Sequence, residues 1–350
     1  MKPLPIRRAV KRMRPYQPPL EGRTNKLRMD FNENPIGCSP SVRRALRRLA
    51  ASSISAYPEQ VTVRRKVARH FGVGPDELLL TNGTDEALSL VVNTFVESDH
   101  RVLLVEPTYA MYRFYSELAG ARIAAPRYDA EMRFPWNGVL TELKKRPRVL
   151  FLPNPNSPTG NLLSAAELRR ILQAAVRTIV VIDEAYFEFS RVTVVPWIRR
   201  CKNLIVTRTF SKTAGLAGLR LGCLFVNADM AADMRKAQSP YPVNVAALAA
   251  AEAAIQDRGF LARTVREVCR GRAELERGLA RLGVRSFPSA GNFVLVHFGE
   301  RTKAIVAALE RKAILIRDRS SDFGGEGYAR ITFGTMEQTR HLLRELERVL

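Results

Sequence analysis

One lysine stands directly after a stretch that is typical of a buried strand. Residues 203–206 are mostly apolar, and the chain then presents Thr209, Ser211 and Lys212, followed by a glycine-rich stretch with Arg220. A partly desolvated lysine has a lowered pKa and becomes an amine nucleophile that can form a Schiff base with an aldehyde. The neighbouring hydroxyls and the guanidinium would donate hydrogen bonds to a phosphate. A solvated lysine in a flexible loop explains this segment equally well when it is considered alone.

Polar residues also follow other stretches that are typical of strands. In open α/β sheets, ligands bind at the carboxyl ends of the strands, so these positions test whether Lys212 belongs to a binding site. Residues 78–81 lead into a glycine turn with Gly83, Thr84 and Asp85, which opens a helix. Free backbone amides at a helix N-terminus bind phosphate well. An ordinary capped helix has the same residues, so this turn by itself decides nothing.

Three more strand ends present an aromatic ring, an amide and a carboxylate. Tyr109 follows an apolar run, and its ring could stack on a flat heteroaromatic ring, although a core tyrosine is the better explanation when it is considered alone. Asn156 lies in a proline-rich loop after the next run. Asp183 ends a third run, with Tyr186 close behind it. A carboxylate at the end of a wholly apolar strand is semi-buried and requires a cationic or protonated partner.

The strand ends together supply the parts that pyridoxal phosphate requires. They offer an amine for its aldehyde, a carboxylate for its pyridinium nitrogen, an aromatic face, an amide and a phenol for its ring hydroxyl, and donors for its phosphate. We therefore interpret the set as a pyridoxal phosphate site with Lys212 as the residue that binds the cofactor. A competing interpretation is the Walker B strand of an NTPase, because four apolar residues precede Asp183 and Glu184. That motif requires a GxxxxGK[ST] loop, which the sequence lacks.

The charge and composition of the chain indicate which kinds of molecule it could bind. With 350 residues it can hold two domains, and a hydrophobic content of 46% is typical of a globular protein. The net charge of +22 is typical of some nucleic-acid-binding proteins, but the arginines are spread along the chain and match no nucleic-acid-binding motif. We therefore expect a solvated basic surface, with no nucleic acid and no membrane among the partners.

Metal binding, membrane insertion and secretion are not expected. The four cysteines and four histidines are scattered without the spacing of a metal site. No apolar run is long enough to span a membrane, and the N-terminus has basic residues without the apolar stretch of a secretory signal. These features predict a cytoplasmic protein.

Apolar runs alternate with helical patterns over most of the chain. Continuous apolar strands separated by helices favour a mostly parallel sheet covered on both faces, which is an α/β fold. Residues 245–282 have a helical pattern, and residues 283–350 read as a small α+β unit. We expect an N-terminal arm at 1–35, a large cofactor-binding domain at 36–265, and a small C-terminal α+β domain at 266–350 that the N-terminal segment joins. The expected strands of the large sheet are residues 78–81, 102–105, 149–152, 179–183, 204–207 and 223–226.

In their order along the chain, these motifs resemble those of the fold-type I pyridoxal phosphate-dependent aminotransferases of class I/II. The branch that they resemble is histidinol-phosphate aminotransferase, and the likeness covers nearly the whole chain. It implies a mostly parallel seven-stranded sheet, a small α+β domain and a homodimer with shared active sites. It also implies a ping-pong transfer of the amino group of L-histidinol phosphate to 2-oxoglutarate, a step of histidine biosynthesis. The matching segments are residues 57–58, 82–86, 107–109, 154–160, 183–186, 208–212, 219–222 and 330–334.

The resemblance implies a role for each residue at a matching position of the cofactor site. Lys212 would form the aldimine with the cofactor and then move a proton as base and acid. Asp183 would pair with the pyridine nitrogen, and Tyr109 would stack on the ring. Tyr186, together with Asn156, would contact the ring hydroxyl. The residues implied around the phosphate are Gly83, Thr84, Asp85, Thr209, Ser211 and Arg220, with Tyr57 from the neighbouring subunit.

The resemblance also implies which residues bind the substrates, a small-molecule amino donor and a 2-oxo acid acceptor. Arg330 would grip the α-carboxylate of the substrate. Tyr16, Asn32 and Arg317 would line the end that receives the substrate side chain, where a phosphorylated substrate would place its anion.

Two positions depart from the pattern of the family. Ser157 stands directly before Pro-Thr-Gly, where asparagine is common. Either Asn156 makes the contact with the ring hydroxyl, or that hydrogen bond is weakened. Thr84 stands where a smaller alanine is common, which should be tolerated because backbone amides bind the phosphate.

The sequence leaves two kinds of alternative open. On the same fold, an aromatic amino acid aminotransferase or a decarboxylase of a phosphorylated amino acid would use the same cofactor residues. From another class, a basic nucleic-acid-binding protein on a degenerate scaffold would bind no cofactor, and its binding of nucleic acid would depend strongly on salt.

Overall fold

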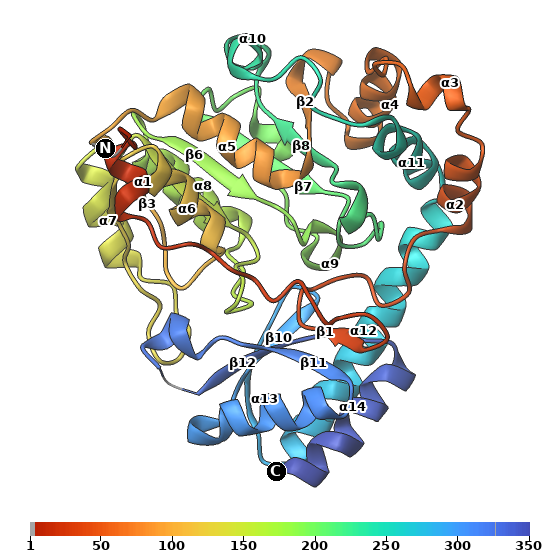
Figure 1. The fold of residues 1–350 in the computed structure, drawn as a ribbon. Helices are drawn as coiled ribbons and strands as arrows, with labels where there is room; N and C mark the ends of the chain where they lie inside the picture. Colours follow the sequence, from red (N-terminus) through yellow and green to blue (C-terminus); the bar gives the residue numbers. More distant parts are fainter. Residues whose placement is uncertain (1–3, 326) are drawn as a thin grey trace.

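A computed structural model describes residues 4–325 and 327–350 of the chain. Two sheets organise it, a larger one in the upper part of Figure 1 and a smaller one below. The larger sheet has seven strands in the order β2 (Leu78–Thr81), β8 (Gly222–Phe225), β7 (Leu204–Thr209), β6 (Ile179–Asp183), β5 (Val149–Pro153), β3 (Arg101–Leu103) and β4 (Arg122–Ala124). The predicted seven-stranded sheet is therefore confirmed.

The larger sheet is mostly parallel, as the continuous apolar runs predicted. β8 alone among the described strands of this sheet runs antiparallel to its neighbours, β2 and β7. All the other neighbouring pairs are parallel. Strands β5 and β8 are buried along their whole length, which explains why they are apolar at every position instead of alternating with polar residues.

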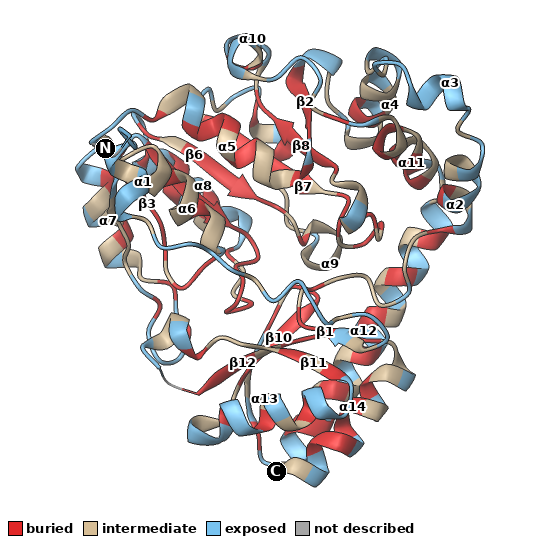
Figure 2. Ribbon diagram, viewed as in Figure 1, coloured by how far each residue is buried: buried red, intermediate tan, exposed pale blue. Residues whose placement is uncertain are grey.

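Helices cover both faces of the larger sheet. Alternate side chains of β5 belong to different cores, because Val149 and Phe151 pack in one cluster while Leu150 and Leu152 pack in the other. The strands between the helix layers form the buried centre of this part of the molecule (Figure 2). The first face carries α5 (Gly83–Phe95), α6 (Ala110–Leu118) and α10 (Ala228–Ala237). The second carries α2 (Pro40–Arg47), α4 (Val61–Phe71), α7 (Trp136–Lys144), α8 (Ala165–Ala174) and α11 (Val245–Gln256).

The smaller sheet has its own hydrophobic core. Its strand order is β1 (Leu27–Met29), β11 (Ile314–Asp318), β12 (Tyr328–Thr332), β10 (Phe293–His297) and β9 (Arg285–Phe287). The helices that pack on it are α12 (Arg258–Arg281), α13 (Thr302–Arg311) and α14 (Met336–Val349). β1 comes from the N-terminal segment and pairs in parallel with β11, so two ends of the chain meet in one sheet.

The predicted division into an arm and two domains stays a prediction. The predicted boundary between residues 265 and 266 falls inside the continuous helix α12, which leaves the larger sheet and runs down beside the smaller one (Figure 1). The expected helical stretch 245–282 is two helices, because Asp257 ends α11 and its carboxylate caps α12 by accepting a hydrogen bond from the Phe260 amide.

The elements that sequence patterns missed are mostly short. β1, β4 and β9 have three residues each, which is too few for an alternating or continuous apolar pattern to stand out. The short helices α1 (Arg8–Arg12), α3 (Ala51–Ile54) and α9 (Phe187–Ser190) bury no residue completely. Tertiary contacts, rather than local pattern, therefore decide these elements.

Within residues 4–325 and 327–350, none of the helices has the length and hydrophobicity required to cross a bilayer. In the same part of the chain, no three acidic, histidine or cysteine side chains come together as metal ligands would.

A buried ion pair joins β6 to β7 behind the loop that carries Lys212. The Arg208 guanidinium donates from Nε and Nη2 to Oε2 of Glu184, at 2.9 and 2.7 Å, and both side chains are almost inaccessible to solvent. The Thr193 hydroxyl and the Val194 amide donate further hydrogen bonds to the same carboxylate. If the cation is removed, the buried carboxylate is left without a partner in surroundings of low polarity. Loss of one member of this pair should therefore destabilise the fold strongly.

We expect Arg208→Met to lower the free energy of unfolding by about 3–5 kcal/mol, because Glu184 would remain buried without its cation. The measurement is chemical denaturation followed by fluorescence. The matched control is Arg122→Met, which removes the exposed ion pair with Asp99 and should cost about 1 kcal/mol or less. Equal losses for the two variants would contradict the role given to the buried pair.

Candidate active site

The register of the larger sheet brings the polar strand ends together. Pro153, Asp183 and Thr207 are paired across the neighbouring strands β5, β6 and β7. Because these strands are parallel, the loops that follow them leave from the same edge of the sheet. Thr209 is paired with Gly222 of β8, and Gly222 is in turn paired with Thr81 at the end of β2. The predicted strand ends therefore form one continuous region.

Lys212 lies in this region without an ion-pair partner among the described residues. Its Nζ donates a hydrogen bond to the backbone oxygen of Phe31, at 3.0 Å, and lies 5.9 Å from the centre of the Tyr186 ring. Burial lowers the pKa of the Lys212 amine from its ordinary value. A lysine in this state can serve as a nucleophilic amine, and the predicted role of Lys212 stays a prediction.

Asp183 is a buried carboxylate that also lacks a cationic partner in the described part of the chain. Its Oδ2 accepts a hydrogen bond from the Tyr112 hydroxyl at 2.7 Å, and its Oδ1 accepts one from the Ala185 amide at 3.1 Å. Burial raises the pKa of Asp183 to about 6, although the hydrogen bond from Tyr112 opposes that shift. A protonated ring nitrogen is the kind of partner that would keep this carboxylate ionised.

The N-terminus of α5 forms a compact donor site together with Arg220. Gly83 has a left-handed backbone (φ +72°), and a Cβ there would lie 2.5 Å from Nη2 of Arg220. A Cβ on Gly222 would lie 2.7 Å from the backbone nitrogen of Thr84, so both glycines permit close approach of the backbone. The Thr84 hydroxyl is buried and has no hydrogen-bond partner among the described residues. These features fit a phosphate group at the helix N-terminus.

The remaining residues predicted around the phosphate lie beside this helix end. Arg220 Nη2 contacts Oδ2 of Asp85 at 2.9 Å, and the Tyr109 hydroxyl donates to Oδ1 of the same carboxylate at 2.8 Å. The backbone amide of Ser211 donates to the Thr209 hydroxyl at 3.0 Å. The structure thus brings together the six positions predicted for the phosphate, and it places Tyr109 next to them.

Asn156 connects two loops of the site. Its Oδ1 accepts a hydrogen bond from the Thr108 hydroxyl at 2.8 Å. Its Nδ2 donates to the Pro107 backbone oxygen at 2.9 Å and to the Thr159 hydroxyl at 2.8 Å. Both amide hydrogens are therefore in use, and a contact with a ring hydroxyl would require one of them to be released. The predicted contact of Asn156 with the cofactor stays a prediction.

The Tyr186 hydroxyl lies at the meeting point of the two sheets. It accepts a hydrogen bond from Nδ2 of Asn32 at 2.8 Å, and its ring packs edge-on against Phe293 of β10. Asn32 is itself buried, and its Oδ1 accepts a hydrogen bond from the Thr332 hydroxyl at 3.2 Å. Asn32 therefore supports Tyr186 in this structure.

Arg330 reaches the site from β12 of the smaller sheet. Its Nη1 donates to the Ser157 hydroxyl at 2.9 Å, and its Nη2 donates to the backbone oxygen of Asp30 at 2.6 Å. Its Nε is buried and has no hydrogen-bond partner among the described residues. Burial, followed by the nearby charge of Arg319, lowers the pKa of Arg330 to about 10. No described carboxylate pairs with this half-buried guanidinium, which suits a site for an anionic ligand.

Two further predicted residues lie near Arg330. The Arg317 guanidinium lies 5.6 Å from the centre of the Phe31 ring, and burial lowers its pKa. Tyr16 is partly exposed, and it is close enough to Arg317 and Arg330 to affect the pKa of both. This end of the site therefore collects positive charge without a matching carboxylate on Arg317 or Arg330 in the described chain.

Tyr57 does not join the other predicted residues within the described chain. It follows α3 on the outside of the molecule with 76% of its surface exposed. Its ring stacks on the ring of Tyr241, also exposed, with the centres 4.3 Å apart. An exposed aromatic pair of this kind is typical of a surface that binds another chain.

Several residues around the site were not predicted from the sequence. Tyr112 lies three positions after Tyr109, a helical spacing that would have indicated a second tyrosine on the same face. Arg319 lies directly after β11, and besides burial its charge lowers the pKa of both Arg317 and Arg330. The backbone oxygens of Asp30 and Phe31 leave no trace in the sequence, because any residue supplies a carbonyl.

Comparison with known proteins agrees with this geometry. The profile of the family described as aminotransferase class I and II matches residues 24–346. Histidinol-phosphate aminotransferase 2 of Methylococcus capsulatus is 36% identical over 93% of this chain and 90% of its own. Histidinol-phosphate aminotransferase of Symbiobacterium thermophilum is 36% identical over 99% of this chain and 98% of its own. The crystal structure of histidinol-phosphate aminotransferase from Sinorhizobium meliloti in complex with pyridoxal-5'-phosphate is 28% identical, with a TM-score of 0.84 over 92% of this chain and 91% of that one.

These similarities confirm the resemblance that the sequence motifs indicated. The family profile covers nearly the whole chain, and the relatives align from end to end, so the likeness includes both sheets. They favour neither a degenerate nucleic-acid-binding scaffold nor the aromatic and decarboxylase alternatives. The chain belongs to the class I and II aminotransferases of fold type I.

Proposed function

We propose that this protein transfers the amino group of L-histidinol phosphate to 2-oxoglutarate as a step of histidine biosynthesis, with pyridoxal phosphate as its cofactor. The relatives named for this reaction support the substrate, because they are 36% identical over almost the full chain. The observation that carries the proposal is the position of Lys212 and Asp183 at neighbouring strand ends. Asp183 is buried and Lys212 is half-buried, and both lack an ion-pair partner in the described chain.

The cofactor would use the strand ends of the larger sheet. The backbone amides of α5, the Thr84 hydroxyl and Arg220 would hold its phosphate, with Thr209 and Ser211 beside them. Tyr109 would lie against the ring. When bound, pyridoxal phosphate supplies an aldehyde that condenses with amines and a ring that accepts the electrons released at the substrate α-carbon.

Lys212 would act twice in the reaction. Its lowered pKa makes the neutral amine accessible, so the amine can react with the cofactor aldehyde. Once the substrate amine has displaced it, the same amine can accept the proton from the substrate α-carbon as a general base and return it as an acid. The hydrogen bond to the Phe31 oxygen is donated through an N–H of Nζ, so it leaves the lone pair of the neutral amine free for both uses.

Asp183 and Tyr186 would contact two different groups of the cofactor, its ring nitrogen and its ring hydroxyl. The ionised Asp183 carboxylate would hold a proton on the ring nitrogen, and Tyr112 would keep that carboxylate oriented. The Tyr186 hydroxyl, held by Asn32, would donate its hydrogen bond to the ring hydroxyl. Arg330, with no carboxylate bound in the described chain, would receive the anionic group of the substrate, and Arg317 would add positive charge at the same end.

The proposal includes a homodimer in the cytoplasm. Tyr57 lies on the outside of its own chain, stacked on an equally exposed Tyr241, and would complete the phosphate site of a neighbouring subunit. The resulting assembly would have two active sites, each built from both chains.

The decisive experiment is an absorbance spectrum of the purified protein with cofactor. Histidinol phosphate should bleach the visible band of the bound cofactor, and 2-oxoglutarate should restore it. Lys212→Ala should lower the transamination rate by roughly 10²–10⁴-fold or more, because the group that moves the proton is gone. Lys202→Ala is the matched control, since Lys202 is an exposed lysine just before the same strand and should leave the rate unchanged.

Other outcomes of this experiment would redirect the proposal. Bleaching by phenylalanine or tyrosine but not by histidinol phosphate would favour an aromatic aminotransferase. Release of CO2 would favour a decarboxylase. If no band formed with added cofactor, the enzymatic proposal would be wrong, and salt-dependent nucleic-acid binding would be tested instead.

Cofactor affinity should depend on the ionisation of Asp183. The folded pKa of about 6 lies above the ordinary value, so the carboxyl is protonated below pH 6 and loses its attraction for the ring nitrogen there. The same upward shift means that burial of the carboxyl favours folding when it is protonated, and this contribution is lost as the pH rises through 6. We expect the wild-type dissociation constant for pyridoxal phosphate to rise up to about tenfold for each pH unit below 6.

The control for this pH dependence is Asp183→Asn, measured by cofactor titration over the same range. The cofactor phosphate and ring also titrate, but they do so in both proteins, so the difference between the two curves isolates Asp183. The variant should bind more weakly above pH 6 and approach the wild type below it. Parallel curves for the two proteins would show that Asp183 does not ionise in this way.

A further inference from the structure

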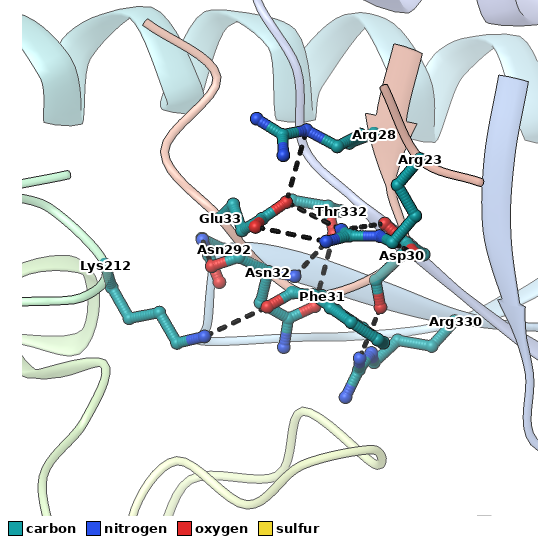
Figure 3. A network of polar contacts seen from close by, with 10 residues as sticks. All are labelled: Arg23, Arg28, Asp30, Phe31, Asn32, Glu33, Lys212, Asn292, Arg330 and Thr332. Atoms are coloured by element: carbon teal, nitrogen blue, oxygen red, sulfur yellow. Dashed lines mark hydrogen bonds and ion pairs between the residues drawn. The ribbon is translucent and has the colours of Figure 1, made fainter. Parts of the chain in front are cut away.

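A short part of the N-terminal chain, residues 30–33, lies between the two sheets and contacts charged residues from both. We call it the bridging segment. The Phe31 oxygen accepts a hydrogen bond from Nζ of Lys212 at 3.0 Å, and the Asp30 oxygen accepts one from Nη2 of Arg330 at 2.6 Å. Figure 3 shows these two side chains reaching the bridging segment from opposite sides. One piece of backbone therefore holds the amine and the guanidinium of the candidate site.

Asn32 ties the bridging segment to three more residues. Its backbone amide donates to the Thr332 hydroxyl at 3.0 Å, and its backbone oxygen accepts from Nδ2 of Asn292 at 3.0 Å. Its side chain donates to the Tyr186 hydroxyl at 2.8 Å. A shift of this backbone would therefore move the support of Lys212, Arg330 and Tyr186 together.

Arg23 clamps the bridging segment at both ends. Its Nε and Nη2 contact the two oxygens of Asp30 at 3.1 and 2.8 Å, and its Nη1 and Nη2 contact those of Glu33 at 3.4 and 2.8 Å. The guanidinium carbon also lies 4.1 Å from the centre of the Phe31 ring. Only 11% of the Arg23 side chain is exposed. A planar guanidinium with several donors is suited to hold two carboxylates in a fixed relative position.

We propose that Arg23 is a positioning residue for the reaction, acting through the backbone and side chains of the bridging segment on Lys212, Arg330 and Tyr186. This role rests on the proposed function. No contact within the described chain joins Arg23 directly to Lys212 or Arg330, so its effect passes through residues 30–33. The two carboxylates that it binds are the charged ends of that segment (Figure 3).

Arg23 also neutralises a carboxylate that acts on the amine. Burial is the largest influence on the pKa of Lys212 and lowers it. Among the charged and titratable groups around the amine, Tyr186 and Glu33 raise this pKa, whereas Arg330 and Arg220 lower it. Removal of Arg23 would leave Glu33 without its closest cation and should move the pKa of Lys212 upward.

The test compares Arg23→Met and Arg23→Lys with Arg28→Met. Arg28 is the control because it is a second arginine close to Glu33, but its side chain is 52% exposed. Its Nε lies 3.7 Å from the Glu33 carboxylate. The first readout is the pH dependence of acylation of Lys212 in the cofactor-free protein, followed by mass spectrometry. The second is kcat and KM of the holoenzyme with histidinol phosphate, and the third is thermal unfolding.

We expect Arg23→Met to raise the pKa of Lys212 and to lower kcat/KM roughly 10- to 100-fold, since small displacements of reacting groups have effects of this size. Arg23→Lys keeps the positive charge but loses the planar guanidinium that contacts two carboxylates at once. It should therefore keep the pKa of Lys212 near that of the wild type and recover part of kcat/KM. Arg28→Met should change neither quantity more than about twofold. The proposal is overturned if Arg23→Met and Arg28→Met give the same Lys212 pKa and the same kcat/KM.

A second variant separates positioning from loss of the fold. If Arg23→Met unfolds, Arg23→Lys and the double variant Arg23→Met/Glu33→Gln take its place. The double variant removes one of the two carboxylates that Arg23 binds, Glu33, which is the one that acts on the pKa of Lys212. It should restore the Lys212 pKa and leave kcat/KM low, and a kcat/KM equal to that of the wild type would overturn the proposal. If the wild-type holoenzyme ignores histidinol phosphate, the proposed function fails, whereas acylation of Lys212 still tests its dependence on Arg23.

Discussion

The candidate site depends on one half-buried amine, that of Lys212, which has no carboxylate partner among the described residues. Lys212 is bound in this structure only by a backbone oxygen at 3.0 Å among the described hydrogen bonds, and burial lowers its pKa. A cation in that position is costly unless a ligand reacts with it or compensates it. The sheet supports the arrangement from behind, where the buried pair of Glu184 and Arg208 joins the two strands that lead to Asp183 and Lys212.

The second constraint is that the site needs both sheets. The larger sheet places the amine, the carboxylate and the phosphate-binding helix end at neighbouring strand ends. The smaller sheet contributes Arg330, whose guanidinium has no carboxylate partner in the described chain. The bridging segment contacts Lys212 on one side and Arg330 on the other, so the distance between the reacting centre and the anion site depends on the placement of four residues.

Sequence patterns located the strands and turns correctly where long apolar runs end in polar residues. The strand before Asp183 and the glycine turn at Gly83 were located to within a residue or two, because burial on both faces makes these strands apolar throughout. Three-residue strands such as β1 could not be predicted, since their stability comes from partners distant in sequence. The role of the Phe31 carbonyl could not be predicted from the sequence either. It depends on where the backbone lies, and a residue of any type at this position would supply the same oxygen. The contact of Asn156 with the cofactor stays a prediction, and the hydrogen bonds that engage its amide join loops 48 residues apart in the sequence.

The role of Lys212 is tested most directly by identifying the residue that binds the cofactor. Borohydride reduction of the holoenzyme converts the reversible linkage with the cofactor aldehyde into a stable secondary amine, which peptide mapping by mass spectrometry can locate. We expect one pyridoxyl phosphate group per chain, on Lys212. A label on another lysine, or no label in protein that contains stoichiometric cofactor, would contradict it.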